Sequence, residues 1–253
     1  MATFNGERYI REQVDSILMQ LSVKDELIIS DDGSTDSTLD ILEKYSDCRI
    51  HLLLATERLG VIGNFERALN YAKGDIIFLA DQDDVWMNEK YNIMCSYLNE
   101  YDLVVCDSII VDSNLNVICN SFFDYFGSGP GIMKNILRSS YYGSCMAFKK
   151  ELLQKSLPFP KTKEIGHDLW IGLVGELVGK VLFLRQSLIK YRRHDATMTS
   201  LNLSLNRSSR SLSEKIAGRI IMVANVCLYY LKYLCINNIP CWISSFFKHK
   251  TIE

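Results

Sequence analysis

Three acidic side chains that follow a short apolar run are the residues best suited to chemistry. Residues 76–80 are apolar, and Asp81, Gln82, Asp83 and Asp84 come directly after them. Three carboxylates this close repel one another and are costly to bury without a cation. Mg²⁺ and Mn²⁺ are commonly held by one or two carboxylates while phosphate oxygens complete their shell. The alternative is a solvated acidic turn in which Asp83 or Asp84 caps the next helix, but a cap needs one acid, not three.

Polar side chains also follow two earlier strands. Residues 26–30 form an apolar run that ends in Asp31 and Asp32, and a strand fragment at the start of the chain leads into Asn5. Helical patterns alternate with these strands, which is typical of an α/β protein with a doubly wound sheet. Ligands of such sheets bind beyond the carboxyl ends of the strands. We therefore expect the polar residues at these ends and the acid turn to share one rim, with Thr3, Asn5, Asp31, Asp32, Asp81 and Asp83 among them.

The first strand has almost no length, because only three residues precede Phe4 and Asn5. A core strand this short leaves N–H and C=O groups of the neighbouring strands unpaired. We therefore expect the start of this sequence to be truncated or misassigned, at a cost to stability and to nucleotide affinity.

The second half of the chain contains more strands and one strongly apolar helix. Residues 102–107 read as a strand, 108–117 as a strand or hairpin, and 181–184 and 187–191 as two short strands. Residues 120–130 are aromatic and Gly-rich, which predicts a mobile loop over the rim. An apolar helix begins near Asp168 and ends near Gly179.

Composition limits the class of protein. The chain has 253 residues, 48% of them apolar and 23% charged, which is ordinary for a globular protein. A formal net charge of −2 makes duplex nucleic acid an improbable partner, so any phosphate must be bound locally. The eight cysteines include no C-x-x-C pair, which favours buried free thiols in a reducing compartment. With no signal peptide in the sequence, the expected location is cytoplasmic.

The last fifth of the chain differs in character. Residues 201–212 resemble a linker, and residues 215–233 predict a helix that is apolar almost all round. Aromatic residues and lysines follow, up to Lys250. Residues 213–250 therefore favour either a peripheral contact with the inner face of the plasma membrane or packing on the main domain or a second copy. We divide the chain into residues 1–105, residues 106–200 of the same domain, and residues 201–253 as linker and helical extension.

Six short motifs together resemble a known family. Over residues 1 to about 200 the chain is similar to the family-two glycosyltransferases of the GT-A fold, and within them to bacterial rhamnosyltransferase-like enzymes. The matching motifs are Ala2-Thr3-Phe4-Asn5-Gly6, Ser30-Asp31-Asp32-Gly33-Ser34-Thr35-Asp36, Asp81-Gln82-Asp83-Asp84-Val85-Trp86, Gly143-Ser144-Cys145-Met146-Ala147-Phe148, His167-Asp168-Leu169-Trp170 and Tyr191-Arg192-Arg193-His194. The resemblance implies a mixed, doubly wound GT-A sheet flanked by helices.

The resemblance also implies a role for each donor-site residue. Thr3 and Asn5 would line a nucleotide pocket, and Asp31 or Asp32 would accept the N3–H of uracil or thymine. Asp81 would contact the ribose, and Asp83 would bind Mg²⁺ or Mn²⁺ on the diphosphate, as the two acids of the family's D-x-D element do.

The remaining implied roles belong to the acceptor side. Asp168 would be the catalytic base, and His194, with Arg192 or Arg193, would reach the diphosphate. Each has a plainer alternative: Asp168 as a helix N-cap, His194 as a surface histidine, and the two arginines as a solvated pair.

The function implied by the resemblance is metal-dependent, inverting sugar transfer. The donor would be a UDP- or dTDP-sugar, with rhamnose suggested by the subgroup, and the acceptor a glycan or lipid-linked glycan of a bacterial surface polysaccharide. The competing hypothesis is a non-catalytic, nucleotide-binding scaffold of a polysaccharide assembly complex. A nucleotidyltransferase ranks below both, because we find no Gly-rich basic loop for a triphosphate.

Overall fold

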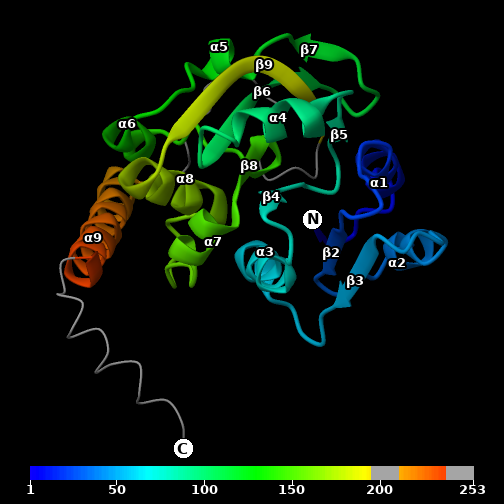
Figure 1. The fold of residues 1–253 in the computed structure, drawn as a ribbon, viewed down its shortest axis with the longest axis horizontal. Helices are drawn as coiled ribbons and strands as arrows, with labels where there is room; N and C mark the ends of the chain where they lie inside the picture. Colours follow the sequence, from blue (N-terminus) through cyan, green and yellow to red (C-terminus); the bar gives the residue numbers. More distant parts are fainter. Residues whose placement is uncertain (195–210, 238–253) are drawn as a thin grey trace, which may run out of the picture. The chain divides into compact units, whose positions relative to one another are not determined.

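The computed structural model describes residues 1–194 and 211–237 (Figure 1). The chain divides into two compact units, residues 1–209 and residues 210–253. The predicted linker at 201–212 and the aromatic and lysine-rich segment after the last helix lie almost wholly outside the described residues.

The first sheet holds three parallel strands in the order β1-β2-β3. β1 spans Ala2–Thr3, β2 spans Leu27–Asp31 and β3 spans Ile50–Leu54. Every residue of β2 is buried, which explains its unbroken apolar sequence up to Ser30 and Asp31. The helices that alternate with these strands are α1 (Ile10–Leu18), α2 (Thr38–Leu42) and α3 (Gly60–Tyr71).

The second sheet is mixed, with the order β4-β8-β6-β9-β5 and β7 paired to β6. β6 and β9 are parallel, whereas the other pairs are antiparallel. The bounds are β4 Ile76–Phe78, β5 Val85–Trp86, β6 Leu103–Val111, β7 Val117–Cys119, β8 Met146–Lys149 and β9 Val181–Arg192. The predicted α/β class is confirmed, but two sheets replace the one doubly wound sheet that was expected.

Helices of the second half pack around β6, whose residues are almost all buried. They are α4 (Lys90–Tyr97), α5 (Phe122–Phe126), α6 (Ile132–Leu137), α7 (Lys150–Ser156) and α8 (His167–Val178), with a 3₁₀ turn at Gly143–Cys145. α8 is buried over most of its length, as its apolar composition requires.

Two predictions for this half were wrong. The segment at residues 120–130 contains α5, where the Ser121 side chain accepts a hydrogen bond from the Asp124 N–H and Gly127 ends the helix in the left-handed region. Phe122 packs there against the Tyr142 ring at a centroid distance of 4.2 Å. The two short strands predicted at 181–191 are one strand, β9, because its pairing with β6 continues through a register shift.

The second unit contributes α9, which spans Leu212–Asn237 and confirms the helix predicted there. Within the described residues, no helix is long and apolar enough to cross a bilayer. Of the cysteines in the described residues, Cys106 and Cys145 are buried free thiols as predicted, whereas Cys48, Cys227 and Cys235 are free but exposed.

Candidate functional site

Gln82 joins the acid turn to the end of β1. Its Oε1 accepts hydrogen bonds from the Thr3 hydroxyl at 2.6 Å and the Phe4 N–H at 2.8 Å, and its Nε2 donates to the Phe4 carbonyl at 3.1 Å. A Cβ at Gly6 would lie 2.4 Å from Gln82 Oε1, so only glycine permits this approach. The predicted meeting of two strand ends at one rim is therefore present, and a residue that the sequence did not single out makes the contact.

The loops after β1 and β2 hold each other through Asn5. Asn5 adopts a positive φ of 50°, accepts a bond from the Thr35 N–H at 2.8 Å, and donates its own N–H to Ser34 Oγ at 2.9 Å. The Asp31 carboxylate accepts the N–H groups of Gly33 and Ser34 at 2.9 and 2.8 Å. Thr3, Asn5 and Asp31 thus lie in one connected network at the rim.

The Asp32 side chain binds the backbone at the start of α3. Its carboxylate accepts the N–H groups of Leu59 at 2.7 Å and Gly60 at 3.0 Å, and Arg58 lies 3.8 Å away. Arg58 also covers the Phe4 ring, with its guanidinium carbon 3.7 Å from the ring centroid. Asp32 is buried, so its direct effect is to order this loop.

The end of β9 fixes the acid turn from the other side. Asp84 is buried and accepts the Arg192 N–H at 2.9 Å, while Arg192 Nε donates to the Asp83 carbonyl at 2.6 Å. His194 Nε2 lies 2.9 Å from Asp83 Oδ2, and both side chains remain partly exposed. His194 therefore touches the predicted metal ligand directly. Because Arg192 and Arg193 are both buried, the solvated-pair interpretation of the two arginines is wrong.

Asp81 connects the acid turn to the beginning of α8. Burial, together with the nearby Asp83 and Asp168 carboxylates, raises the pKa of the Asp81 carboxyl to about 7. Burial, together with the Asp83 and Asp81 carboxylates, raises the pKa of Asp84. Because such an effect falls off with distance, Asp83 and Asp168 both lie near Asp81. The structure therefore brings the acid turn and Asp168 together.

Asp168 lies in the first turn of α8 but is not its N-cap, since Gly166 holds that position. Asp168 Oδ1 accepts the Leu169 N–H at 2.7 Å, and a Cβ at Gly143 would lie 3.9 Å from the Asp168 Cβ. Burial, with Asp168 close by, raises the pKa of the Tyr142 hydroxyl to about 12. The Gly143 turn and Tyr142 thus border the carboxylate of Asp168.

His167 points into the core rather than toward this space. Its ring stacks on Phe65 at a centroid distance of 4.0 Å, and burial lowers its pKa. The imidazole is therefore neutral at physiological pH and acts as a packing residue.

Lys90 is a second functional candidate that sequence reasoning missed. Its side chain is fully buried, its Nζ donates to the Ser144 carbonyl at 2.6 Å, and it lies 4.6 Å from the centroid of the Trp86 ring. The ammonium group lowers the raised pKa of Asp81, so it supplies positive charge beneath the acid turn. Its position six residues after Asp84 in a helix gives no sign of burial, because the partner carbonyl comes from a turn 54 residues later.

The acid turn fits a divalent cation that also needs phosphate oxygens. Among residues 1–194 and 211–237, no three His, Cys, Asp or Glu side chains form a complete protein cage for a metal. Asp83 offers a partly exposed carboxylate next to His194, and the repulsion that raises the pKa of Asp81 is what a cation would relieve. Asp83, the predicted metal ligand, is therefore the residue that would hold Mg²⁺ or Mn²⁺, with Asp81, the predicted ribose contact, beside it.

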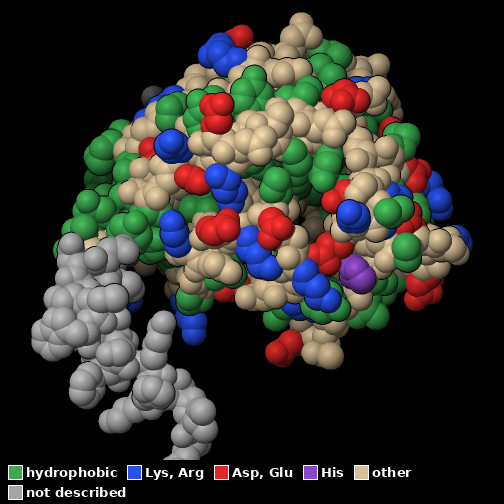
Figure 2. All heavy atoms as spheres, in the orientation of Figure 1, with side chains coloured by type: hydrophobic (Ala, Val, Ile, Leu, Met, Phe, Trp, Pro, Cys, Tyr) green, Lys and Arg blue, Asp and Glu red, His purple; other side chains and the backbone are tan. Residues whose placement is uncertain are grey.

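The face shown in Figure 2 mixes acidic and basic side chains. On this face of the described residues, Lys and Arg are not gathered into one broad basic patch. This distribution agrees with the small formal net charge of −2.

Known proteins are similar to this chain in sequence. Residues 1–157 match the family model described as "Glycosyl transferase family 2". The dTDP-rhamnosyl transferase RfbG of Shigella flexneri is 29% identical over 234 residues, which cover 84% of this chain and 78% of RfbG. The UDP-Glc:alpha-D-GlcNAc-diphosphoundecaprenol beta-1,3-glucosyltransferase WfgD of Escherichia coli is 27% identical over 177 residues, covering 69% of this chain and 68% of WfgD.

Solved structures share the fold. S. aureus TarS 1–349 aligns with a TM-score of 0.62 at 21% identity, over 76% of this chain and 58% of that chain. Its complex with UDP-GlcNAc aligns with a TM-score of 0.66 at 18% identity, over 92% and 70%. The mannosyltransferase PcManGT of Pyrobaculum calidifontis, in complex with GDP-Man and Mn²⁺, aligns with a TM-score of 0.52 at 23% identity, over 73% and 53%.

Proposed function

Because this chain belongs to glycosyl transferase family 2 and has the GT-A fold, we propose that it transfers a sugar from a nucleoside diphosphate donor with inversion at the anomeric carbon. The observation that carries the proposal is the closeness of Asp168 to the acid turn: a Cβ at Gly143 would lie 3.9 Å from the Asp168 Cβ and 3.7 Å from Leu79, two residues before Asp81, and the Asp168 carboxylate raises the pKa of Asp81. The site thus combines a place for the diphosphate at the acid turn with a separate carboxylate, Asp168, on α8. Asp168 lies beyond the 1–157 family match, so its role rests on this geometry.

Asp83 holds a divalent cation in this proposal, and Asp81 contacts the ribose of the donor. Bound Mg²⁺ or Mn²⁺ supplies Lewis-acid neutralisation of the negative charge on the departing diphosphate. Lys90 and the Arg192 backbone keep the acid turn in place from below and from the side. His194, in contact with Asp83, lies where it can donate a hydrogen bond to a phosphate oxygen.

Asp168 acts as the general base. Its carboxylate accepts the proton of an acceptor hydroxyl while that oxygen bonds to the anomeric carbon, a contribution of roughly 10²–10⁴-fold. With a single base and no enzymic nucleophile, one displacement occurs and the configuration inverts. The Gly143 turn leaves room beside Asp168, since a side chain there would meet both His167 and Asp168.

The donor in this proposal is a UDP- or dTDP-sugar, with dTDP-rhamnose the first candidate because a rhamnosyl transferase is among the similar proteins. Thr3, Asn5, Asp31 and Asp32 order the loops against which the nucleoside would lie. The acceptor is a glycan or a lipid-linked glycan, the class named for WfgD. We also propose a peripheral membrane contact through the C-terminal extension, which would bring the site to a lipid-linked acceptor.

The test is a transfer assay with a panel of nucleotide sugars, with Mn²⁺ or Mg²⁺ and with a chelator. Asp168→Asn is expected to retain metal-dependent nucleotide binding and to lose turnover by at least 10²-fold. Asp83→Asn is expected to lose the metal-dependent part of nucleotide binding. Asp40→Asn, an exposed acid on α2, is the matched control and is expected to behave as the parent.

A scaffold gives a different pattern. It would bind a nucleotide without turnover, and neither Asp83→Asn nor Asp168→Asn would change an assembly phenotype. Parent protein that binds nucleotide but neither hydrolyses nor transfers any donor sugar would favour the scaffold over the enzyme.

A further inference from the structure

Two cysteines lie opposite each other in the second sheet. β6 and β8 are antiparallel, and Val105 pairs with Met146. One step further along this register places Cys106 opposite Cys145, the last residue of the 3₁₀ turn. Opposed residues of antiparallel strands have Cα atoms about 4.5–5.5 Å apart, and disulfides form at Cα separations of about 4.4–6.8 Å. The backbone therefore has the spacing that a disulfide needs.

The two side chains also meet. Cys106 and Cys145 are both buried free thiols, and they share a side-chain hydrogen bond. Cys119 provides a contrast, because it lies on β7 of the same sheet but is paired with Ile110. Cys106 and Cys145 thus combine facing side chains with a suitable backbone, whereas Cys119 has no thiol opposite it in its strand pair.

A buried cation lies beside the two thiols. Lys90 Nζ donates to the carbonyl of Ser144, the neighbour of Cys145, at 2.6 Å. Burial disfavours the Cys106 thiolate, but the hydrogen bond from Cys145 and the Lys90 ammonium together lower the pKa of Cys106, against the opposing charge of Asp107. The same hydrogen bond, with burial, raises the pKa of Cys145. Cys106 is therefore the better nucleophile, and Cys145 keeps its proton.

One short turn connects the thiols to the candidate site. Cys145 ends the turn Gly143–Cys145, and its N–H donates to the Tyr142 carbonyl at 2.9 Å. A Cβ at Gly143 would lie 3.9 Å from the Asp168 Cβ, and the Ser144 carbonyl holds Lys90 beneath the acid turn. A movement of Cys145 toward β6 therefore moves groups beside Asp168.

We propose that Cys106 and Cys145 form a reversible disulfide, and that its formation displaces the Gly143–Cys145 turn beside Asp168. The oxidant is a small peroxide. The Cys106 thiolate attacks a peroxide oxygen, the O–O bond breaks, and the released hydroxide takes up a proton to become water. The Cys145 sulfur then attacks the sulfenic sulfur of Cys106, the S–O bond breaks, and a second water leaves with the Cys145 proton. The two thiols lose two electrons, and hydrogen peroxide gains them.

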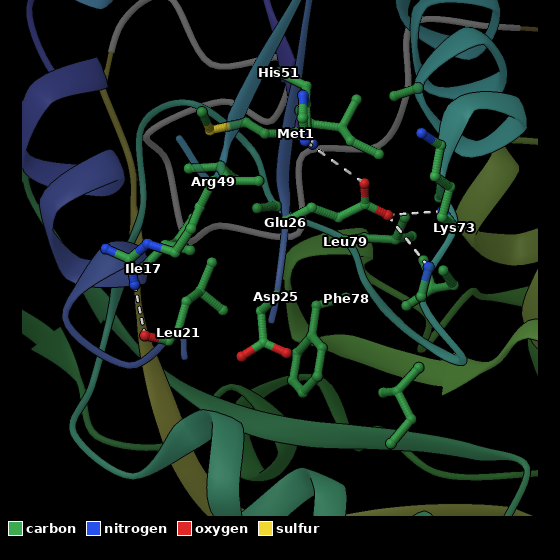
Figure 3. Close-up of a pocket in the computed structure, with 18 of the residues that line it drawn as sticks. Met1, Ile17, Leu21, Asp25, Glu26, Arg49, His51, Lys73, Phe78 and Leu79 are labelled. Atoms are coloured by element: carbon green, nitrogen blue, oxygen red, sulfur yellow. Dashed lines mark hydrogen bonds and ion pairs between the residues drawn. The ribbon is translucent and has the colours of Figure 1, made fainter. Parts of the chain in front are cut away.

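Burial restricts the oxidant to a small molecule. Cys106 is 0% exposed and Cys145 is 3% exposed. Among the described residues, neither cysteine lines the cavity of about 680 Å³ between β2 and β4 that Figure 3 shows, so that space gives no direct access to them. A water-sized peroxide needs only small local fluctuations, whereas oxidised glutathione needs the sheet to open. We therefore expect hydrogen peroxide to oxidise the pair much faster than oxidised glutathione.

The experiment treats the reduced full chain with hydrogen peroxide or with oxidised glutathione. Remaining thiols are alkylated in denaturant, and linked peptides are mapped by mass spectrometry. Peroxide is expected to give a peptide that joins Cys106 to Cys145, in roughly tenfold greater yield than oxidised glutathione at equal time, and dithiothreitol should restore both thiols. Cys106→Ala and Cys145→Ala should each abolish this peptide, and Cys119→Ala is the matched control that should retain it.

Movement of the turn is measured by amide hydrogen exchange. In the oxidised parent, exchange of the Cys145 amide is expected to be about tenfold faster, because its bond to Tyr142 is broken. Cys106→Ala should show no such change with peroxide. If the folded parent gives no Cys106–Cys145 peptide, or gives it with exchange at Cys145 unchanged, the proposal is overturned.

The consequence for ligand binding rests on the proposed function. With UDP or dTDP and Mn²⁺, the nucleotide-dependent rise in melting temperature is expected in the reduced parent, to be lost on oxidation and to return with dithiothreitol. A parent that forms the disulfide and shows faster exchange at Cys145, but responds to neither nucleotide in either state, supports the disulfide and contradicts the proposed function instead.

Discussion

Replacing Asp81 by asparagine tests the electrostatics of the acid turn. Burial and the Asp83 and Asp168 carboxylates raise the pKa of Asp81 from 3.8 to about 7 in the folded protein. When folding raises the pKa of a carboxyl, its contribution to the free energy of unfolding is fully present at pH values below the pKa of the unfolded chain. This contribution is lost as the pH rises from about 4 to 7. A shift of this size corresponds to at most about 4 kcal/mol.

Asp81→Asn removes the cost of ionising this carboxyl in the folded protein while keeping the shape of the side chain. Allowing for partial solvation of the site, we expect a gain of about 2–4 kcal/mol in the free energy of unfolding above pH 7, and about zero at pH 4. The melting temperature should therefore rise by about 5–10 °C at pH 8. Differential scanning fluorimetry of parent and variant from pH 4 to 8 measures the difference directly. Asp40→Asn serves as the exposed control.

The reasoning would be refuted by a variant that is no more stable than the parent at pH 8, or by a gain that is equal at pH 4 and pH 8. The same substitution is expected to weaken metal-dependent nucleotide binding. A residue that costs stability and supports ligand binding is the expected signature of a functional site.

Three further substitutions probe how the site is held. Lys90→Met removes a fully buried cation from beneath the acid turn and should lower the free energy of unfolding by about 3–5 kcal/mol in chemical denaturation. An unchanged denaturation midpoint would show that the ammonium group is dispensable. Gln82→Met breaks the bonds to Thr3 and Phe4 and should cost about 2–3 kcal/mol, again by denaturant titration. Gly172→Ala places a Cβ 2.4 Å from the Tyr141 ring and should lower the melting temperature by several degrees. Gly175→Ala, with its nearest contact at 3.2 Å, is the milder control, and equal effects would contradict the clash.

The acid turn was predictable because its signals are local. An apolar strand followed at once by three acids places those acids at a strand end, and strand ends in an α/β fold meet at one rim. This rule predicted that Thr3 lies near the acid turn, but it did not predict that the Gln82 side chain makes the contact. In the sequence Gln82 resembles an ordinary turn residue. Only the approach of β1 in three dimensions allows its side chain to form hydrogen bonds with Thr3 and Phe4.

Long-range contacts explain what sequence reasoning missed. Arg192 reaches Asp84 across 108 residues of sequence, so nothing near Arg192 marks it as buried. The helix α5 was misread as a loop because its Gly127 reads as loop composition, whereas the structure uses that glycine as the left-handed C-cap. Both errors arise where one residue type serves two structural purposes and tertiary packing selects between them.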